Sequence, residues 1–346
     1  MSLPNLPAAM RSPVFAGQGR VEWVEKTVPS PGPGQLLLQS KANALCGSEK
    51  GFYLNGSAEL TPGHEAAGVV VAAGPGTTVE VGARGVVFLM DFCGECRSCR
   101  LGYTNQCLHK RADMGFTHDG GYGPYMLVHE NIFFPIDDDV SFTDATLLLD
   151  VMGTGGHAIR RAKLARPDIE SVLVAGAGPI GLALLAMAKI MLGKDVPVFI
   201  TDVTDYRLEL AQKMGGIPIR ADRAELAEEL RKHGLEEVDA AFDSSGRTEA
   251  RRQAMDVLGK RGALVCVGHG GALSLDVSPD LIAAERTVLG SEYFAFAELA
   301  ENAALLKGHL EELRPIITHR YPAGELQQAA ELFFSGQCGK VVVEHE

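Results

Sequence analysis

The stretch from Ser171 to Asp202, SVLVAGAGPIGLALLAMAKIMLGKDVPVFITD, decides the fold. A short apolar run is followed by G-x-G-x-x-G, whose glycines are Gly176, Gly178 and Gly181. The first glycine permits a tight turn, the second lets a pyrophosphate approach the backbone, and the third lets a helix pack closely on the strand. Amides at the N-terminus of that helix can donate to phosphates. The stretch therefore predicts a strand, a phosphate-binding turn, a helix and a second strand.

The second strand of this unit is expected at Val196 to Thr201 and leads into Asp202. This acid follows the last glycine by about 20 residues, the spacing of a carboxylate that accepts from the adenosine ribose. Its charge repels the 2′-phosphate of NADP, so NAD is the predicted cofactor. The positive charge of Arg207 could instead contact the 2′-phosphate of NADP, which is the alternative cofactor. We also expect Pro179 and Ile180, inside the turn, to contact the cofactor.

The regions before and after this unit differ in their residue patterns. The first half is rich in glycine and β-branched residues and predicts strands, whereas the chain after Asp150 alternates between helical and strand patterns. Such alternation predicts a doubly wound parallel sheet of the Rossmann type, an α/β fold. Ser244, Val267 and Gly268 follow predicted strands of that sheet. They are expected to line the nicotinamide half of the cofactor site.

Length and charge narrow the class of protein. A chain of 346 residues favours two domains. Its net charge of −12 argues against binding to nucleic acid or to an anionic membrane. The N-terminal segment MSLPNLPAAMRSPVF is interrupted by prolines and predicts no signal peptide, and no apolar run reaches membrane-spanning length. A cytoplasmic protein is expected.

Four of the seven cysteines form one cluster, Cys93, Cys96, Cys99 and Cys107, with the spacing C-x2-C-x2-C-x7-C. Four thiolates in one short loop suit tetrahedral zinc. An iron–sulfur cluster is the alternative, but the last gap is long and a redox relay has no evident role here. All four zinc positions would be filled by protein, so this site is predicted to be structural.

A second constellation contains Cys46, His64 and Glu65. One thiolate, one imidazole and one carboxylate could hold a zinc ion with an open position for substrate, as catalytic zinc sites do. Each residue alone is equally compatible with an ordinary place in a core. The four-cysteine loop and the nucleotide-binding unit strengthen the catalytic interpretation.

Several motifs together resemble a known family. They are CGSE at 46–49, TPGHEAAGVV at 61–70, CGECRSCRLGYTNQC at 93–107, GGYGPYMLV at 120–128 and VLVAGAGPIGLALLAMAK at 172–189. In this order they are similar to the zinc-dependent alcohol and polyol dehydrogenases of the medium-chain dehydrogenase/reductase superfamily, over nearly the whole chain. The resemblance implies a GroES-like catalytic domain at 1–150 and 288–346, with a structural zinc lobe near 91–110, and a Rossmann domain at 151–287.

The same resemblance implies a role for individual residues. Cys46 and His64 match catalytic zinc ligands, and Glu65 matches a carboxylate that ligates directly in some members and moves in others. Asp150 stands at the position of the remaining ligand, although it could instead cap a helix. Ser48 matches the hydroxyl that relays the alcohol proton. Two zinc ions per chain and a homodimer or homotetramer are implied by analogy.

Two positions depart from the family pattern. Glu49 replaces the usual aspartate, and Gly51 stands near the place of the histidine that passes the proton to solvent, which leaves His157 or a water chain for that step. We predict an NAD-dependent dehydrogenase of a secondary alcohol, polyol or sugar, with loops 51–56, 116–119 and 293–296 around the substrate. The alternatives are a zinc-free NADPH enone or quinone reductase and a nucleotide-binding protein with a decayed site.

Overall fold

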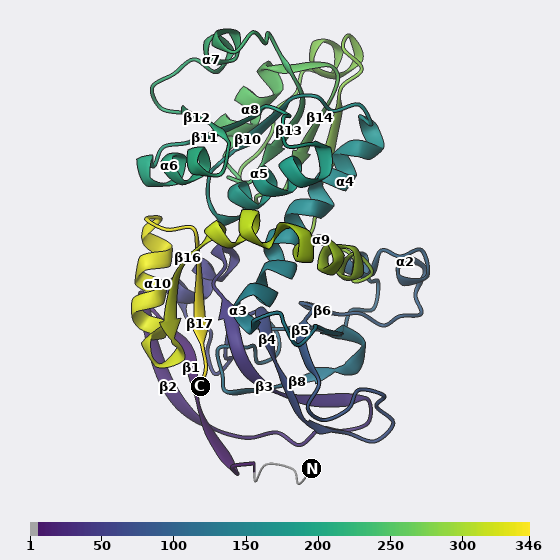
Figure 1. Ribbon diagram of the computed structural model, residues 1–346, viewed down its shortest axis with the longest axis vertical. Helices are drawn as coiled ribbons and strands as arrows, with labels where there is room; N and C mark the ends of the chain where they lie inside the picture. Colours follow the sequence, from purple (N-terminus) through teal and green to yellow (C-terminus); the bar gives the residue numbers. More distant parts are fainter. Residues whose placement is uncertain (1–5) are drawn as a thin grey trace.

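The computed structural model describes residues 6–346, so the first five residues of the N-terminal segment lie outside it. Figure 1 shows two lobes, with a parallel sheet and its helices in the upper one and a second, β-rich region below. The C-terminal strand lies in the lower lobe although the chain has already passed through the upper one. The lower lobe is therefore built from both early and late parts of the chain.

The upper sheet is built from the predicted alternating segments. Its strands are β10 (Val172–Ala175), β11 (Val198–Asp202), β12 (Ile217–Arg220), β13 (Val238–Asp243), β14 (Leu258–Cys266) and β15 (Thr287–Gly290). All neighbours pair in parallel, in the order β12-β11-β10-β13-β14-β15. The order reverses beside β10, which is where dinucleotides bind in such sheets. The prediction of a doubly wound α/β fold is confirmed.

Both faces of this sheet are buried, because its strands are apolar at successive positions. Val174 packs in one core with α5 (Pro179–Leu192) and α6 (Asp205–Lys213). Leu173, which points the other way, packs with α7 (Leu226–Lys232) and α8 (Thr248–Asp256). Continuous apolar runs are typical of parallel strands covered by helices on both sides.

The lower sheet joins strands that are far apart in sequence. They are β3 (Gln35–Ala44), β4 (Glu65–Ala73), β5 (Arg84–Val87), β8 (Tyr125–His129), β9 (Phe133–Pro135), β16 (Ile317–Pro322) and β17 (Lys340–Glu344). The order is β16-β17-β3-β4-β5-β9, and β8 also pairs with β3. The last strand, β17, therefore lies beside β3, with Val342 opposite Ala44.

The other strands, α-helices and π-helices lie outside the two large sheets or cover them. They are β1 (Ala9–Gly17), β2 (Arg20–Thr27), α1 (Lys50–Asn55), β6 (Met90–Asp91), α2 (Arg97–Arg100), β7 (Ala112–Asp113), α3 (Phe142–Ala145), a π-helix (Asp150–Thr154), α4 (Gly155–Ala165), a second π-helix (Ser278–Ile282), α9 (Glu298–Leu313) and α10 (Leu326–Ser335). Figure 1 places α9 at the junction of the two lobes and α4 beside α5 in the upper one. Phe88 of the lower lobe packs against Tyr293 and Phe294, with ring centroids 5.0 and 5.2 Å apart. The loop after β15 is thereby fixed on the lower lobe.

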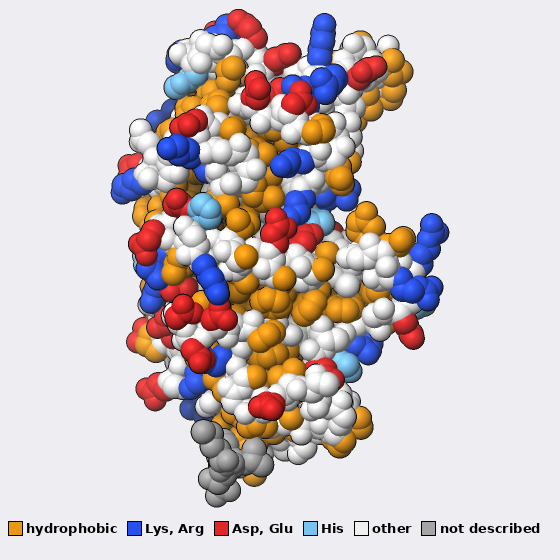
Figure 2. All heavy atoms as spheres, turned by 45° about the vertical axis from the view of Figure 1, so that its right-hand side comes forward, with side chains coloured by type: hydrophobic (Ala, Val, Ile, Leu, Met, Phe, Trp, Pro, Cys, Tyr) orange, Lys and Arg blue, Asp and Glu red, His pale blue; other side chains and the backbone are white. Residues whose placement is uncertain are grey.

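The surface carries charges of both signs. Figure 2 shows acidic and basic side chains interspersed over most of the visible face, with hydrophobic side chains gathered at mid-height. Within residues 6–346, no helix is both long and apolar enough to cross a membrane.

Candidate metal centre and cofactor site

Strand register brings three of the predicted catalytic ligands together. Ala44, the last residue of β3, pairs with Glu65, the first residue of β4. Cys46 comes two residues after Ala44 and His64 comes directly before Glu65, so this pairing brings the three predicted ligands together. Gly63 has φ +104, and a Cβ there would lie 2.7 Å from the backbone nitrogen of Tyr122. Glycine is required at this position because the backbone turns sharply before His64. The fourth ligand, Asp150, is the first residue of the π-helix that leads into α4.

The four predicted ligands form one buried cluster. One candidate ligand atom from each of Cys46, His64, Glu65 and Asp150 lies within 4.8 Å of the other three. The Oδ2 atom of Asp150 is 3.1 Å from the Cys46 sulfur and 3.6 Å from Nε2 of His64. All four side chains are at most 9% exposed. Asp150 therefore points into the cluster and does not cap a helix.

The chemistry of this donor set fits a divalent cation. Burial and the charge of Asp150 raise the pKa of the Cys46 thiol and raise the pKa of Glu65 well above its usual range. In addition, the Oε2 atom of Glu65 is buried without a hydrogen-bond partner. A zinc ion would offset the mutual repulsion of these groups and supply a partner for the carboxylate oxygen.

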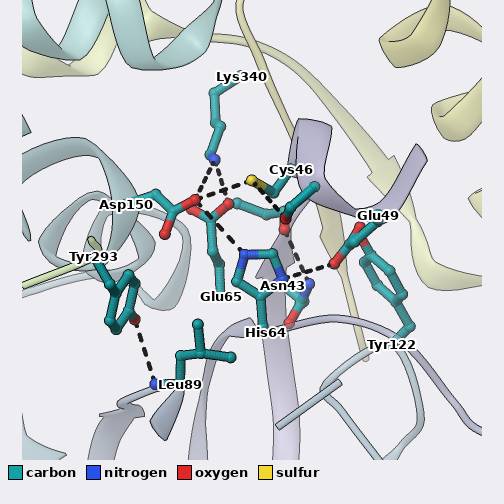
Figure 3. A network of polar contacts seen from close by, with 12 residues as sticks. Asn43, Cys46, Glu49, His64, Glu65, Leu89, Tyr122, Asp150, Tyr293 and Lys340 are labelled. Carbon is teal, nitrogen blue, oxygen red and sulfur yellow. Dashed lines mark hydrogen bonds and ion pairs between the residues drawn. The ribbon is translucent and has the colours of Figure 1, made fainter. Parts of the chain in front are cut away.

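Sequence reasoning missed Lys340, the first residue of β17. Its side chain is 2% exposed, and its ammonium group binds Oε1 of Glu65 and lies 3.8 Å from Oδ2 of Asp150. In Figure 3 the ammonium group of Lys340 lies above the carboxylates of Glu65 and Asp150, and Cys46 lies to its right. Burial alone would raise the pKa of Asp150, but Lys340 and His64 outweigh it and lower that pKa below its usual range. Lys340 thus balances part of the negative charge of the cluster.

Glu49, one of the two departures from the family pattern, contacts the ring of His64 in the structure. Its Oε1 atom lies 3.0 Å from Nδ1 of His64, and its Oε2 atom accepts a 2.5 Å hydrogen bond from the Tyr122 hydroxyl. Figure 3 shows this chain leading away from the metal cluster. A carboxylate on Nδ1 orients the ring so that Nε2 faces the metal. Glu49 stands in the motif CGSE and Tyr122 in the motif GGYGPYMLV, but neither motif indicates that the two side chains meet.

Around this cluster is a cavity of about 500 Å³, the catalytic cavity, lined by Cys46, Ser48, His64, Asp150, Phe116 and Tyr293 among others. The Ser48 hydroxyl is 3.3 Å from the Cys46 sulfur, at the wall of this cavity. Residues 51–56 do not line this cavity, because 50–55 form α1. His157 is also absent from its lining and binds Glu298, with 2.6 Å between Nδ1 and Oε1.

The four-cysteine loop forms a separate metal-binding cluster. Its sulfur–sulfur distances are 3.4 Å between Cys96 and Cys99, 3.5 Å between Cys93 and Cys107, and 4.0 Å for two further pairs. Zn–S bonds of about 2.3 Å place tetrahedral sulfurs about 3.8 Å apart. Backbone N–H groups of Cys99 and Leu108 lower the pKa of Cys96 to about 6, which favours the thiolate. The cluster fits a closed, structural zinc ion.

Replacing one of these cysteines tests the structural role of this loop. In Cys99→Ser, we expect one zinc ion per chain to be lost and the loop to unfold locally, because structural zinc contributes folding energy directly. Trypsin should then cleave after Arg97 or Arg100, both inside the loop. Metal analysis and limited proteolysis measure the two effects. The matched variant Ser98→Ala should keep both zinc ions, and equal metal content in Cys99→Ser would contradict the assignment.

The glycine-rich turn has the geometry that phosphate binding needs. Gly176 has φ +98, and a Cβ on Gly181 would lie 1.8 Å from the carbonyl oxygen of Gly176. A Cβ on Gly178 would meet only the Arg207 side chain, at 3.7 Å or more, so this residue faces open space. The helix α5 starts at Pro179 and presents its N-terminus to that space. Gly176 therefore forms the tight turn, Gly181 allows the close packing of helix and strand, and the backbone of Gly178 is open to a ligand.

A cavity of about 650 Å³, the dinucleotide cavity, lies over this turn. Its lining includes eight predicted cofactor residues: Gly176, Gly178, Pro179, Ile180, Gly181, Asp202, Arg207 and Ser244. The two others, Val267 and Gly268, line the catalytic cavity together with Ile180 and Ser244. Cys46 and Gly47 line both cavities. The dinucleotide cavity thus meets the candidate zinc site at Cys46.

Asp202 is held in place by the backbone around it. Its carboxylate accepts hydrogen bonds from the amides of Ala177, Val203 and Thr204, at 2.8, 2.8 and 2.9 Å. A guanidinium nitrogen of Arg207 is 4.0 Å from the same carboxylate. The acid is therefore fixed at the end of β11, where a ribose would lie.

A parallel doubly wound sheet, a glycine-rich phosphate turn and a Cys/His/carboxylate cluster beside it define a class of metal-dependent dinucleotide oxidoreductases. Comparison with known proteins narrows this class. Residues 32–138 match the family model of the alcohol dehydrogenase GroES-like domain, and residues 179–308 match that of zinc-binding dehydrogenases.

Individual relatives agree with these matches. The chain is 31% identical over 348 residues to L-threonine 3-dehydrogenase of Deinococcus radiodurans, covering 95% of this chain and 96% of the relative. Its fold is similar to the RspB dehydrogenase of E. coli CFT073 in complex with NADH, with a TM-score of 0.88, 24% identity and coverage of 98% and 100%. It also resembles a cobalt- and zinc-bound alcohol dehydrogenase from Pyrobaculum aerophilum, with a TM-score of 0.82, 25% identity and coverage of 97% and 99%.

The chain belongs to the zinc-dependent alcohol dehydrogenases of the medium-chain dehydrogenase/reductase superfamily. It is an oxidoreductase that transfers a hydride between an alcohol and a nicotinamide dinucleotide, and its lower lobe contains the GroES-like domain. The predicted family and fold class are confirmed.

Proposed function

We propose that this enzyme oxidises a secondary alcohol, polyol or sugar with NAD, at the cluster of Cys46, His64, Glu65 and Asp150. The observation that carries the proposal is that Cys46 lines both the catalytic and the dinucleotide cavity. A substrate at the metal cluster therefore lies next to the cofactor. The similarity to an L-threonine 3-dehydrogenase supports an alcohol as substrate.

The protein side chains have distinct roles in this proposal. Bound zinc would supply Lewis acidity toward an alcohol oxygen, and bound NAD would supply the hydride acceptor. Ser48 lines the catalytic cavity and would accept the hydroxyl proton of the substrate. Glu49 fixes the ring of His64, and Lys340 holds the carboxylate of Glu65. Ile180 and Val267 line the catalytic cavity where the nicotinamide would lie.

NAD is proposed over NADP because Asp202 faces the dinucleotide cavity as a carboxylate. It would accept from a free 2′-hydroxyl and repel a 2′-phosphate. Arg207 would attract the 2′-phosphate of NADP, but its guanidinium lies 4.0 Å from the Asp202 carboxylate, which repels that phosphate. An unmodified enzyme that prefers NADP would overturn this choice.

Asp202→Asn is expected to shift the cofactor preference. The ratio of kcat/KM for NADP to that for NAD should rise about tenfold or more, because the repelling charge is gone and Arg207 remains. Initial rates with both cofactors measure the ratio. Asp205→Asn is a matched control in the same turn, because the side chain of Asp205 is 72% exposed and lies outside the cavity lining. A shift of the same size in the control would contradict the role of Asp202.

The proposed function is tested with a panel of polyols, sugars and simple alcohols, assayed with NAD and NADP in parallel. Reduction of NAD by one of these classes is the expected result. Metal analysis separates the zinc-free enone or quinone reductase, which would contain no catalytic zinc. Absence of turnover with every alcohol, in protein with two zinc ions, would favour the decayed nucleotide-binding site.

We further propose the domain boundaries at 150/151 and 287/288 and a homodimer or homotetramer, which sedimentation measures. The cytoplasm is the proposed location, because reduced thiols are needed at Cys46 and in the four-cysteine loop. Small hydroxylated molecules are the proposed partners, without nucleic acid or membrane, because the net charge is −12.

A further inference from the structure

The segment 291–296, the return loop, leads the chain from β15 of the upper sheet to α9. Its first three residues, Ser291, Glu292 and Tyr293, line the catalytic cavity. The hydroxyl of Tyr293 accepts a 3.3 Å hydrogen bond from the backbone N–H of Leu89, which Figure 3 shows as a dashed line. The return loop is therefore one wall of the cavity in which the alcohol is proposed to bind.

Tyr293 has an unusual backbone conformation. Its φ is +48°, and of the five non-glycine residues with positive φ within residues 6–346 it is the only buried one, at 7% exposed. A bulky residue in this region of φ is strained and persists only where the surrounding structure holds it. The contacts with Leu89 and Phe88 hold the ring of Tyr293. The backbone on either side of it needs restraints of its own.

Two side chains of the four-cysteine loop supply these restraints. The side-chain amide of Asn105 donates to the carbonyl oxygen of Glu292 at 2.7 Å, one residue before Tyr293. The hydroxyl of Thr104 accepts from the backbone N–H of Phe296 at 2.8 Å, three residues after Tyr293. Thr104 and Asn105 are 9% and 7% exposed, so water competes little for either hydrogen bond. The return loop is thus clamped on both sides of its strained residue.

We propose that the four-cysteine loop positions Tyr293 and thereby restricts the size of the alcohol that fits the catalytic cavity. Cys107, the last cysteine of the metal cluster, directly follows the short 3₁₀ turn that contains Thr104 and Asn105. A zinc ion in the cluster would fix this turn, and with it the two side chains that hold the return loop. Thr104 and Asn105 are positioning residues, because they act on the cavity only through Tyr293. The inference rests on the proposed function, because it concerns the wall of the same cavity.

The first test measures amide hydrogen exchange in the full-length, zinc-loaded enzyme without substrate. The double variant Thr104→Val/Asn105→Ala removes both hydrogen bonds to the return loop. The amide of Leu89 should then exchange about tenfold faster or more, because it loses its acceptor when Tyr293 moves. Neither altered side chain forms a hydrogen bond to Leu89, so a merely local effect leaves this amide unchanged. Metal analysis should still find two zinc ions.

Two single variants serve as matched controls for this measurement. Thr104→Ser keeps the hydroxyl that accepts from Phe296, so exchange at Leu89 should stay as slow as in the unmodified enzyme. Gln106→Ala changes an exposed residue of the same turn that lies outside the lining of the catalytic cavity, and it should also leave this exchange unchanged. If the double variant does not fold, the comparison of Thr104→Val with Thr104→Ser decides the same question.

The second test uses NAD and two secondary alcohols of different size, propan-2-ol and cyclohexanol. In Thr104→Val/Asn105→Ala and in Tyr293→Ala, the ratio of kcat/KM for cyclohexanol to that for propan-2-ol should rise about threefold or more, because the released wall admits the larger ring. The change should come mainly from a lower KM for cyclohexanol. The affinity for NADH should stay the same, since the return loop does not line the dinucleotide cavity.

Three results would overturn the inference. One is unchanged exchange at Leu89 in the double variant. Another is faster exchange together with the loss of a zinc ion, which would assign the effect to unfolding of the four-cysteine loop. The third is faster exchange at Leu89 with an unchanged ratio for the two alcohols. An unmodified enzyme that oxidises no alcohol, polyol or sugar refutes the proposed function and the size restriction with it, whereas hydrogen exchange judges the positioning of Tyr293 independently.

Discussion

Cys46→Ala is expected to lose the catalytic zinc ion and nearly all turnover while it still binds NADH. The sulfur of Cys46 lies 3.1 Å from Oδ2 of Asp150 in a cluster that needs its thiolate to complete the donor set. Lewis-acid stabilisation is worth several kcal/mol, so kcat/KM should fall by about 10³-fold or more. NADH binding should persist because the glycine-rich turn around Gly176 is untouched. Metal analysis, initial rates and NADH fluorescence measure the three quantities.

Two further variants test whether the loss of zinc is specific to Cys46. Ser48→Ala should keep both zinc ions and NADH binding but lose turnover, because it removes only the proton relay. Cys338→Ala is the matched cysteine control, since Cys338 is buried in a hydrophobic core and belongs to neither metal cluster. It should keep two zinc ions. Full turnover in both Cys46→Ala and Ser48→Ala would refute the proposed mechanism.

The nucleotide site could be predicted because its information is local. The strand, turn and helix around Gly176 lie in one stretch, and Asp202 follows at the end of the next strand, so spacing alone indicated the residues around the glycine-rich turn. The four-cysteine loop is equally local. In both cases the chemistry follows from a few residues whose separation along the chain limits their separation in space.

The contacts around the catalytic cluster could not be predicted in the same way. Lys340 binds Glu65 across 275 positions of sequence, and Tyr122 binds Glu49 across 73. Only the pairing of β17 with β3, and of β3 with β4, brings Lys340 to Glu65. Glu49 shows a second reason why the sequence was insufficient. It departs from the family pattern, yet its carboxylate lies 3.0 Å from Nδ1 of His64.

Lys340→Met is expected to lower the free energy of unfolding of the zinc-loaded enzyme by about 3–5 kcal/mol. The side chain of Lys340 is 2% exposed, and its ammonium lies between the carboxylates of Glu65 and Asp150. Cys46, Glu65 and Asp150 as anions carry one charge more than a zinc ion offsets, and the ammonium supplies the missing positive charge. Urea unfolding with equal zinc loading measures the loss.

The double variant Lys340→Met/Glu65→Gln identifies the cause of that loss. If the instability comes from an uncompensated buried carboxylate, removal of the Glu65 charge should restore most of the lost free energy, because the repulsion from Asp150 then disappears. Lys307→Met is the matched surface control: its side chain is 61% exposed and pairs with Asp137, so its effect should stay below about 1 kcal/mol. A double variant no more stable than Lys340→Met would assign the loss to packing around the lysine stem and would remove Lys340 from the charge balance of the metal site.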